Sequence, residues 1–370
     1  MSGQLSTGDD IAPGGSERKA RMVTIKDIGR ALGLSHATVS RALNDSPYVS
    51  DSTRALVRRK AEEMGYRPDH AARSLRGSAS NLVGFVLPDI RNDFYARIGE
   101  QVARSIADRQ LQLVLSITDD DPRREERQIA ELARMRPRAV ILTPTSRLTA
   151  RAAEMLSRMR VVQMVRRHPA LAADLVVADD REAVAAATRL MLATGHRRIA
   201  YIGGGEQTLS TGTARLAGYR AALREAGLAD DGLCALGPPQ PGFGLEAGLR
   251  LLSATPPPDA VVLGSSQLTT GFLAAAARAG RSVPGDLSLI AYDDPDWFAH
   301  WGPGISAVVL PSASIARAVA AFACGEDPPD PPLRIEPGPG AARSLVYPIA
   351  IARRGSVIDR RNGCREDARR

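Results

Sequence analysis

Cysteine is scarce in this chain, and the side chains that usually build metal or redox sites lie far apart. The three cysteines, Cys234, Cys324 and Cys364, have neither metal-binding nor redox spacing. The five histidines show no zinc-ligand spacing either. We therefore expect no metal site and no cofactor, and we expect reduced thiols in a cytoplasmic protein.

Recognisable catalytic motifs are also missing. The sequence contains no phosphate-binding GxxxxGK[ST] loop and no GxSxG nucleophile motif. Gly203, Gly204 and Gly205 follow an apolar run, but Thr208 stands where a dinucleotide-binding fingerprint has its third glycine. These absences argue against an enzyme, and we predict no catalytic residue.

The ends of the sequence lack long apolar runs. Residues 1–21 are mostly polar and rich in glycine, without the apolar stretch of a signal peptide or membrane anchor. Residues 358–370 are dominated by charged side chains. We expect both segments to be disordered and the protein to make no membrane contact.

Positive charge is present and unevenly distributed. The 370 residues carry a net charge of +8, and residues 21–80 hold 11 lysines and arginines against 6 acidic residues. Such a basic segment favours phosphate backbones. All but three of the 49 basic residues are arginine, however, so part of the charge reflects a general arginine bias. Charge alone does not identify a partner.

The segment 23–41 carries the strongest local signal. Thr24 and Asp27 have the spacing of a capping box that begins a helix. Gly33 permits a sharp turn, and Ser35 with Thr38 predicts a second helix start. Two short helices joined by a tight glycine-containing turn indicate a helix-turn-helix, whose second helix enters the major groove. The alternative is an ordinary helical hairpin with capped ends.

Further helices follow this pair. Ser50 predicts the start of a third helix over 51–64, which Gly65 ends. Pro68 prevents that helix from continuing, and Asp69 could begin a short helix of about two turns. We therefore place a helix-turn-helix domain at 22–66 and a hinge helix or linker at 67–80.

After residue 80, apolar runs of strand length alternate with amphipathic helical stretches, which predicts an α/β fold with parallel sheets. The expected strands are 82–87, 111–117, 139–142, 161–165, 175–178, 199–202, 260–263, 287–292 and 305–310. The expected helices are 94–109, 125–134, 181–192, 215–226, 268–279 and 312–323. So many strands are better divided between two subdomains than held in one sheet.

The chain resembles the lactose-repressor/galactose-repressor (LacI/GalR) family of bacterial transcription regulators. The matching residues lie in the first third of the chain: Val23–Ile28, Ser35–Arg41, Asn44, Val49–Ser50, Thr53–Arg54, Gly65–Tyr66, Pro68 and Ala72–Leu75. The resemblance implies an all-α helix-turn-helix domain followed by a periplasmic-binding-protein-like core of two α/β lobes over 81–357. It implies chain crossovers near 174–180, 303–308 and 330–340. The first lobe would comprise 81–175 and 307–333, and the second 176–304 and 341–357.

The function implied by this resemblance is regulation of transcription. We expect a sequence-specific DNA-binding regulator, most simply a repressor, whose homodimer binds double-stranded DNA at a pseudo-palindromic operator. A sugar or sugar derivative between the lobes would be its effector. The predicted DNA-binding residues lie on the helix-turn-helix and hinge: Thr24, Ser35, His36, Ala37, Thr38, Ser40, Arg41, Asn44, Arg73 and Leu75. Leu75 is predicted to act as an apolar wedge in the minor groove; otherwise it packs on a core.

The predicted effector-binding residues follow strands or begin helices, where open α/β sheets bind ligands. They are Asn92, Phe94, Tyr95, Arg166, Thr211, Arg215, Phe243, Ser265 and Asp293. Aromatic rings offer apolar contact to a sugar face, whereas arginine and aspartate bind hydroxyl groups. The alternatives are core packing for Phe94 and Tyr95, a solvated helix position for Arg215 and a loop cap for Asp293.

Several positions depart from the family pattern. Asp93 replaces a proline, Arg166 an aspartate, Ser265 and Ser266 an Asn-Asp pair, and Leu310 a glutamine. The loss of acidic and gain of basic character favours an anionic ligand, such as a sugar acid or sugar phosphate, but Asp93 argues against it. Asp69 replaces an asparagine in the hinge, which puts one expected phosphate-side contact in doubt.

Two other classes of protein share part of this pattern. A periplasmic sugar-binding protein shares the two-lobed fold but needs a secretion signal and no helix-turn-helix. A sugar-modifying enzyme needs a nucleophile or an acid–base pair, which the sequence does not offer. The sequence does not identify the effector, its effect on DNA affinity, the operator, the regulated genes, or the choice between dimer and tetramer.

Overall fold

The computed structural model describes residues 23–43, 46–66, 80–205, 210–338 and 342–361. The chain divides into two units, Met1–Arg76 and Gly77–Arg370. The predicted hinge helix and the proposed DNA contacts Asn44, Arg73 and Leu75 lie outside the described residues.

Three short helices build the N-terminal unit: α1 (Ile25–Leu32), α2 (His36–Leu43) and α3 (Asp51–Glu63). The Thr24–Asp27 capping box is confirmed, since each residue's side chain accepts the other's backbone N–H. Gly33 ends α1 with φ of 64°, a conformation that favours glycine. The helices meet around a small apolar core: Ile28, Val39, Ala42, Val57 and Ala61.

The starts of helices α2 and α3, and the close approach of α1 to the following turn, also follow from local sequence. Ser35 Oγ accepts the N–H of Thr38 at 3.0 Å, and Ser50 Oγ accepts that of Thr53 at 3.4 Å. Gly29 lets α1 approach the turn, because a Cβ there would lie 2.7 Å from the carbonyl oxygen of Leu34. The helix-turn-helix prediction is therefore confirmed as a packed three-helix unit.

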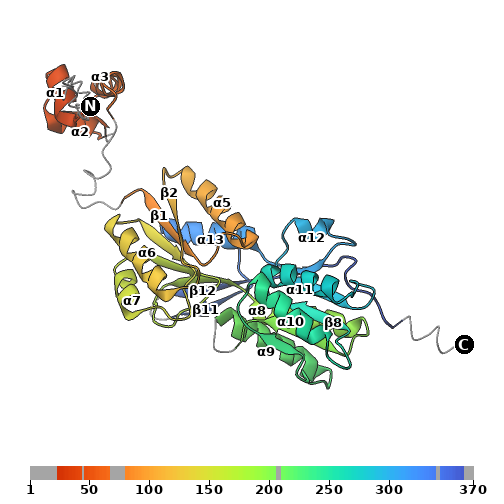
Figure 1. Cartoon of the computed structure of the whole chain (residues 1–370). Helices are drawn as coiled ribbons and strands as arrows, with labels where there is room; N and C mark the ends of the chain where they lie inside the picture. Colours follow the sequence, from red (N-terminus) through yellow and green to blue (C-terminus); the bar gives the residue numbers. More distant parts are fainter. Residues whose placement is uncertain (1–22, 44–45, 67–79, 206–209, 339–341, 362–370) are drawn as a thin grey trace, which may run out of the picture. The chain divides into compact units, whose positions relative to one another are not determined.

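The first lobe of the larger unit is a seven-stranded sheet with helices on both faces (Figure 1). Its strand order is β11 (Arg334–Pro337), β12 (Arg343–Tyr347), β5 (Asp174–Ala178), β4 (Val161–Met164), β3 (Ala139–Leu142), β1 (Leu82–Leu87) and β2 (Gln112–Ile117). All neighbours are parallel except β11 and β12. One face packs on α5 (Asp93–Ala107) and α13 (Ser312–Cys324), the other on α6 (Pro122–Arg134) and α7 (Ala150–Ser157).

The second lobe repeats this layered plan with six strands. Their order is β13 (Ala350–Ala352), β10 (Ser306–Val309), β9 (Ser288–Tyr292), β8 (Ala260–Leu263), β6 (Ile199–Gly203) and β7 (Cys234–Leu236). Only the β10–β13 pair is antiparallel among these described strands. Packed on one face are α10 (Pro241–Leu252), α11 (Ser266–Arg278) and α12 (Trp297–His300); on the other are α8 (Asp180–Ala193) and α9 (Ser210–Glu225).

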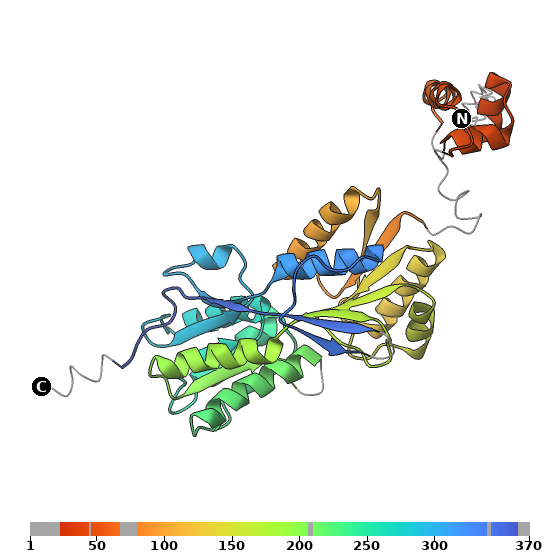
Figure 2. The same cartoon turned by 180° about the vertical axis from the view of Figure 1, so that it is seen from behind.

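The chain passes between the lobes three times, but two predicted crossovers were misplaced. The first, between β5 and α8, agrees with the prediction. The second follows β10, so residues 307–309 belong to the second lobe instead of the first. The third lies at residues 348–349, because β12 pairs with β5 in the first sheet. Figure 2 shows this C-terminal segment, in blue, running from one lobe to the other.

The C-terminal tail begins later than predicted. Ile358 N–H donates to Ser288 Oγ at 3.1 Å, and Arg360 N–H donates to the carbonyl oxygen of Thr194 at 2.9 Å. Residues 358–361 therefore continue along the second lobe instead of starting a disordered tail. Residues 362–370 lie outside the described part of the chain.

Candidate DNA-binding surface and ligand cleft

The start of α2 presents side chains that can reach DNA. His36, Ala37 and Arg41 are exposed, whereas Val39 and Ala42 on the opposite side are buried. This division leaves one helix face for base edges and phosphates while the other holds the helix on the unit's core. Of the remaining predictions, Ser35 is exposed and Thr38 and Ser40 are half-buried. Thr24 is exposed and is also committed to its capping box.

The loop before α3 contains a feature that sequence analysis missed. The side chain of Tyr48 is 87% exposed, which is unusual for so large an aromatic residue. Arg54 holds this loop, since its Nη2 donates to the carbonyl oxygens of Ser46 and Val49, both at 3.1 Å. The loop is thus fixed while Tyr48 points away from the core. A lone tyrosine next to a proline and a helix cap was not recognisable as exposed from sequence.

A cleft of about 690 Å³ lies in the larger unit, where both lobes contribute its walls. Its lining comes from segments that follow the carboxyl ends of strands, as expected for open α/β sheets. These segments are 88–95, 119–120, 146, 165–166, 204, 211–215, 237–240, 264–267, 292–293 and 310. A cleft of this size matches those that bind small molecules.

Eight of the nine predicted effector-binding residues line this cleft: Asn92, Phe94, Tyr95, Arg166, Thr211, Arg215, Ser265 and Asp293. Phe243 does not belong to the lining. It packs on the apolar core of the second lobe, and a Cβ at Gly237 would lie only 2.5 Å from its ring. Residues 237–240, which precede Phe243 in the chain, line the cleft instead.

Phe94 and Tyr95 serve both the core and the cleft. Their rings meet edge to face with centroids 5.5 Å apart, and both residues are 95% buried. Burial raises the pKa of the Tyr95 hydroxyl, so this group is neutral at physiological pH. Asn92 begins α5 by accepting the N–H of Phe94 at 3.1 Å. The two alternatives considered for these rings, core packing and cleft lining, therefore both hold.

Arg215 lies at the centre of a buried polar cluster. Its Nε donates to Asp180 Oδ1 and its Nη1 to the carbonyl oxygen of Gly264, both at 2.8 Å. The guanidinium carbon lies 3.7 Å from the ring centroid of Tyr292, whose hydroxyl also donates to Asp180. Burial disfavours the charge of Arg215, but Asp180 raises its pKa above the ordinary value. Arg215 is thus a fixed cation with its counter-ion in place.

The other charged side chains of the cleft are also paired. Arg166, which is 94% buried, forms a two-point ion pair with Asp120. The remaining pairs that involve a lining residue are Asp89–Arg91, Asp119–Arg124 and Asp293–Arg97. The predicted gain of positive character at Arg166 is therefore offset by an aspartate that the sequence analysis did not consider. A run of three aspartates, 119–121, shortly after a strand was the signal that could have found it.

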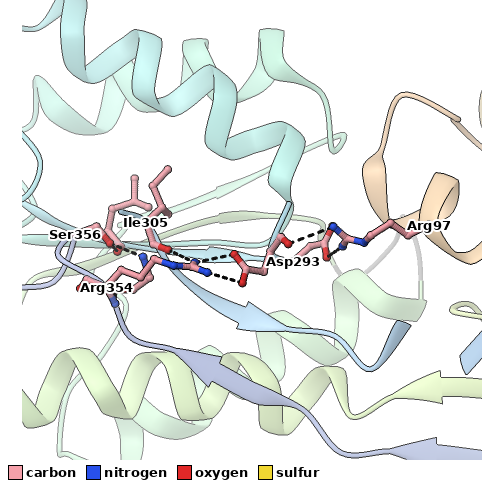
Figure 3. Close-up of polar contacts among 8 residues, drawn as sticks. Arg97, Asp293, Ile305, Arg354 and Ser356 are labelled. Carbon is pink, nitrogen blue, oxygen red and sulfur yellow. Dashed lines mark hydrogen bonds and ion pairs between the residues drawn. The ribbon is translucent and has the colours of Figure 1, made fainter. Parts of the chain in front are cut away.

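Asp293 binds Arg97 of the first lobe, and Asp294 binds Arg354 of the second lobe (Figure 3). Arg97 Nη2 lies 2.6 Å from Asp293 Oδ1, and its Nη1 donates to the carbonyl oxygen of Asp294 at 3.2 Å. Arg354 binds both carboxylate oxygens of Asp294, at 2.7 and 2.8 Å. Burial raises the pKa of the Asp293 carboxyl, and the nearby Arg97 opposes this shift.

Other site types find no support in the described residues. No group of three or more histidine, cysteine, aspartate or glutamate side chains in the described part of the chain could hold a metal ion. Within the same ranges, no helix has the length and apolar character needed to cross a bilayer. A helix-turn-helix unit joined to a two-lobed core with a ligand-sized cleft defines the class of ligand-responsive DNA-binding regulators.

Comparison with known proteins supports this class. Residues 24–69 match the model of the bacterial regulatory proteins of the lacI family, and residues 188–339 match that of the periplasmic binding protein-like domain. The ribose operon repressor of Escherichia coli (strain K12) is 31% identical over 300 residues, covering 80% of this chain and 90% of the repressor. The regulator GalR of the same strain is 30% identical over 304 residues, covering 82% and 88%.

Solved structures show the same fold. The lac repressor dimer bound to operator and the anti-inducer ONPF superposes with a TM-score of 0.77 at 18% identity, covering 91% of this chain and all of the other. The complex of the transcriptional regulator CelR with cellobiose gives a TM-score of 0.62 at 27% identity, covering 90% and 99%. The chain belongs to the lacI family of bacterial regulatory proteins, and it is a DNA-binding transcriptional regulator.

Proposed function

We propose that this regulator is a repressor whose effector is an uncharged sugar or sugar derivative bound in the cleft. The observation that carries this proposal is the pairing of the charged side chains that line the cleft with counter-ions within the protein. An anionic ligand that binds Arg166 or Arg215 would have to displace its aspartate, and a buried charge left without its partner is costly. Hydroxyl groups can instead share the arginines and aspartates, because each hydroxyl both donates and accepts.

The relatives agree with this ligand class. The names of two of them refer to ribose and to cellobiose, both neutral sugars. In our proposal Arg215 and Asp293 orient the sugar, Phe94 covers its apolar face, and Phe243 has no direct role. The protein would act as a homodimer on a pseudo-palindromic operator, as the operator-bound lac repressor dimer does. Two finer predictions, the absence of catalysis and a cytoplasmic location, remain predictions.

Selection from random DNA, followed by ligand titration, tests this function. Full-length protein should enrich a two-fold symmetric sequence, and footprinting on the neighbouring genes should locate it. Neutral mono- and disaccharides, and the corresponding sugar phosphates, are then titrated against the protein–DNA complex. We expect a neutral sugar to change the affinity for DNA. If only the phosphorylated sugars act, the charge argument for the effector is wrong.

A further inference from the structure

Arg97 is an arginine of the first lobe that bonds directly to the second lobe. It lies on α5 of the first lobe and donates hydrogen bonds to Asp293 and Asp294 of the second. Its side chain is 30% exposed, whereas that of Asp293 is 5% exposed. A guanidinium group presents several donors in one rigid plane, so it can hold a carboxylate and a carbonyl oxygen together.

The acceptor side of this contact is rigid. Arg354 holds the Asp294 carboxylate and also donates to the carbonyl oxygen of Ile305 at 2.7 Å. Its backbone N–H donates to Ser306 Oγ at 2.9 Å, at the start of β10. Figure 3 shows Arg97 and Arg354 on opposite sides of Asp293. The Arg97 contact must therefore break when the lobes separate. The same holds for the hydrogen bond from Gln267 Nε2 to the carbonyl oxygen of Arg91, at 3.1 Å, and for that from Arg167 N–H to Ser210 Oγ, at 3.2 Å.

Asp293 is poised for a second partner. It lines the cleft, and its backbone has φ of 70°, which is uncommon outside glycine. Oδ1 binds Arg97, whereas Oδ2 is buried without a hydrogen-bond partner among the described residues. A buried acceptor left unsatisfied is unfavourable, so a ligand that donates a hydrogen bond there gains more than it would at a solvated carboxylate.

We propose that Arg97 is the positioning residue of the cleft: it holds the lobes closed through Asp293 and orients this carboxylate toward a hydroxyl donor of the ligand. Opening the Arg97 contact admits the ligand, the ligand hydroxyl then occupies Oδ2, and reclosure restores the bond to Oδ1. The closed state is thus more stable with ligand than without it, which is the difference that a regulator needs between its two states. This inference rests on the proposed effector function.

The test measures lobe separation in the full-length protein without any ligand. Spin labels attached through genetically encoded ketone side chains at exposed positions 108 and 299 report the distance between the lobes, and native cysteines stay in place. We expect one short-distance population in the wild type. Arg97→Ala should lose that population and gain a longer, broader one. Arg97→Lys keeps the positive charge but lacks the planar set of guanidinium donors. It should therefore show both the short-distance and the long-distance population.

Arg104→Ala is the matched control. Arg104 lies on the same helix and pairs with Glu100 one turn away, so its removal should leave the distances unchanged. The inference is overturned if Arg97→Ala keeps the wild-type distances, or if Arg104→Ala opens the lobes equally. Ribose and cellobiose are then added as probes, and a binding sugar should restore the short distance in Arg97→Ala. If neither these nor any other neutral sugar binds the wild type, the proposed effector class fails while the result for Arg97 stands.

Discussion

Arg166 and Asp120 lie on the first lobe's side of the cleft, where the guanidinium group and the carboxylate form an ion pair through two hydrogen bonds. Nη1 bonds Oδ1, and Nη2 lies 3.1 Å from Oδ2. Nη1 also donates to the carbonyl oxygen of Pro144 at 3.4 Å. The guanidinium group, which looked from sequence like a free anion receptor, is therefore already neutralised.

Removing the negative charge of Asp120 should leave Arg166 able to bind an anion, which the paired Arg166 of the wild type cannot do. We expect inorganic phosphate to raise the unfolding temperature of Asp120→Asn but not that of the wild type, because only the variant offers an unpaired buried cation. Thermal unfolding with increasing phosphate, at constant ionic strength, measures this. Asp89→Asn, whose partner Arg91 has a side chain 82% exposed, is the control and should gain little. Equal stabilisation of the wild type would show that Arg166 is accessible to anions after all.

Arg41 should read sequence. It is exposed on α2, and a guanidinium bound to guanine by two hydrogen bonds gives about 1–3 kcal/mol of discrimination. Arg41→Ala should therefore lose the preference for the selected operator over random DNA in competition binding. Arg30→Ala, an exposed arginine of α1 that pairs with Asp27, should retain it. A specificity ratio unchanged in Arg41→Ala would mean that α2 is not the recognition helix.

Leu75 should matter for DNA and not for folding. As a wedge in the minor groove it adds contact area at the cost of unstacking one base step. Leu75→Ser should weaken operator binding and reduce DNA bending, with no change in unfolding temperature. Gel-shift titration and a bending assay give both values. Loss of thermal stability with unaltered binding would instead assign Leu75 to a core.

Arg215 combines structure with ligand binding, and its two roles can be separated. Arg215→Ala leaves Asp180 buried without its cation, which should cost about 3–5 kcal/mol of unfolding free energy. Arg215→Gln combined with Asp180→Asn removes both charges and should recover much of that loss in denaturant unfolding. The double variant should still bind operator but no longer respond to the effector. A response at the wild-type ligand concentration would exclude Arg215 from the site.

His196 should make the second lobe sensitive to acid. It is fully buried, its Nδ1 lies 3.2 Å from the carbonyl oxygen of Met191, and burial lowers its pKa below the usual 6.5. The folded state thus binds fewer protons than the unfolded state, and stability is lost as pH falls below about 6.5. Between about pH 7.5 and pH 5, the unfolding temperature of His196→Asn should fall less than that of the wild type. His300→Asn, which replaces an exposed histidine, is the control, and its unfolding temperature should depend on pH as that of the wild type does.

Local signals predicted the N-terminal unit well. The caps at Thr24, Ser35 and Ser50 depend on residues three positions apart, so their hydrogen bonds can be inferred without knowledge of the rest of the fold. The strands β1, β3 and β8 were equally clear, since continuous apolar runs indicate strands buried on both faces. The family resemblance supplied what periodicity does not contain, namely the division into two lobes.

Elements that depend on distant packing were missed. The helix α10 contains three glycines, which lower helix propensity. Two of them allow close contact with α11: a Cβ at Gly244 would lie 2.4 Å from the carbonyl oxygen of Leu268, and one at Gly248 would lie 2.6 Å from the Cβ of Ala275. Tertiary contact therefore stabilises a helix that the local sequence disfavours. Phe243 was wrongly placed in the predicted site for the same reason, because it packs half-buried on the core of the second lobe.

The pairing of charged residues in the cleft also could not be predicted from the sequence. Arg97 and Asp293 are 196 positions apart, and Arg215 and Asp180 are 35 apart on different helices. Composition identifies the charged residues, but only the fold selects their partners. The types of side chain in the cleft could be predicted, whereas the net electrostatic character of the cleft could not.

The position of β12 has a consequence for how the protein is made. This strand, from residues 343–347, lies between β5 and β11, so the first sheet is incomplete until nearly the whole chain has left the ribosome. The helix-turn-helix, by contrast, draws its core from residues 23–66 alone. Synthesis of the roughly 280 intervening residues takes about 15–60 s at typical bacterial rates. In each nascent chain the DNA-binding unit can therefore fold well before the ligand cleft forms. During that time no ligand can control the binding of this unit to DNA.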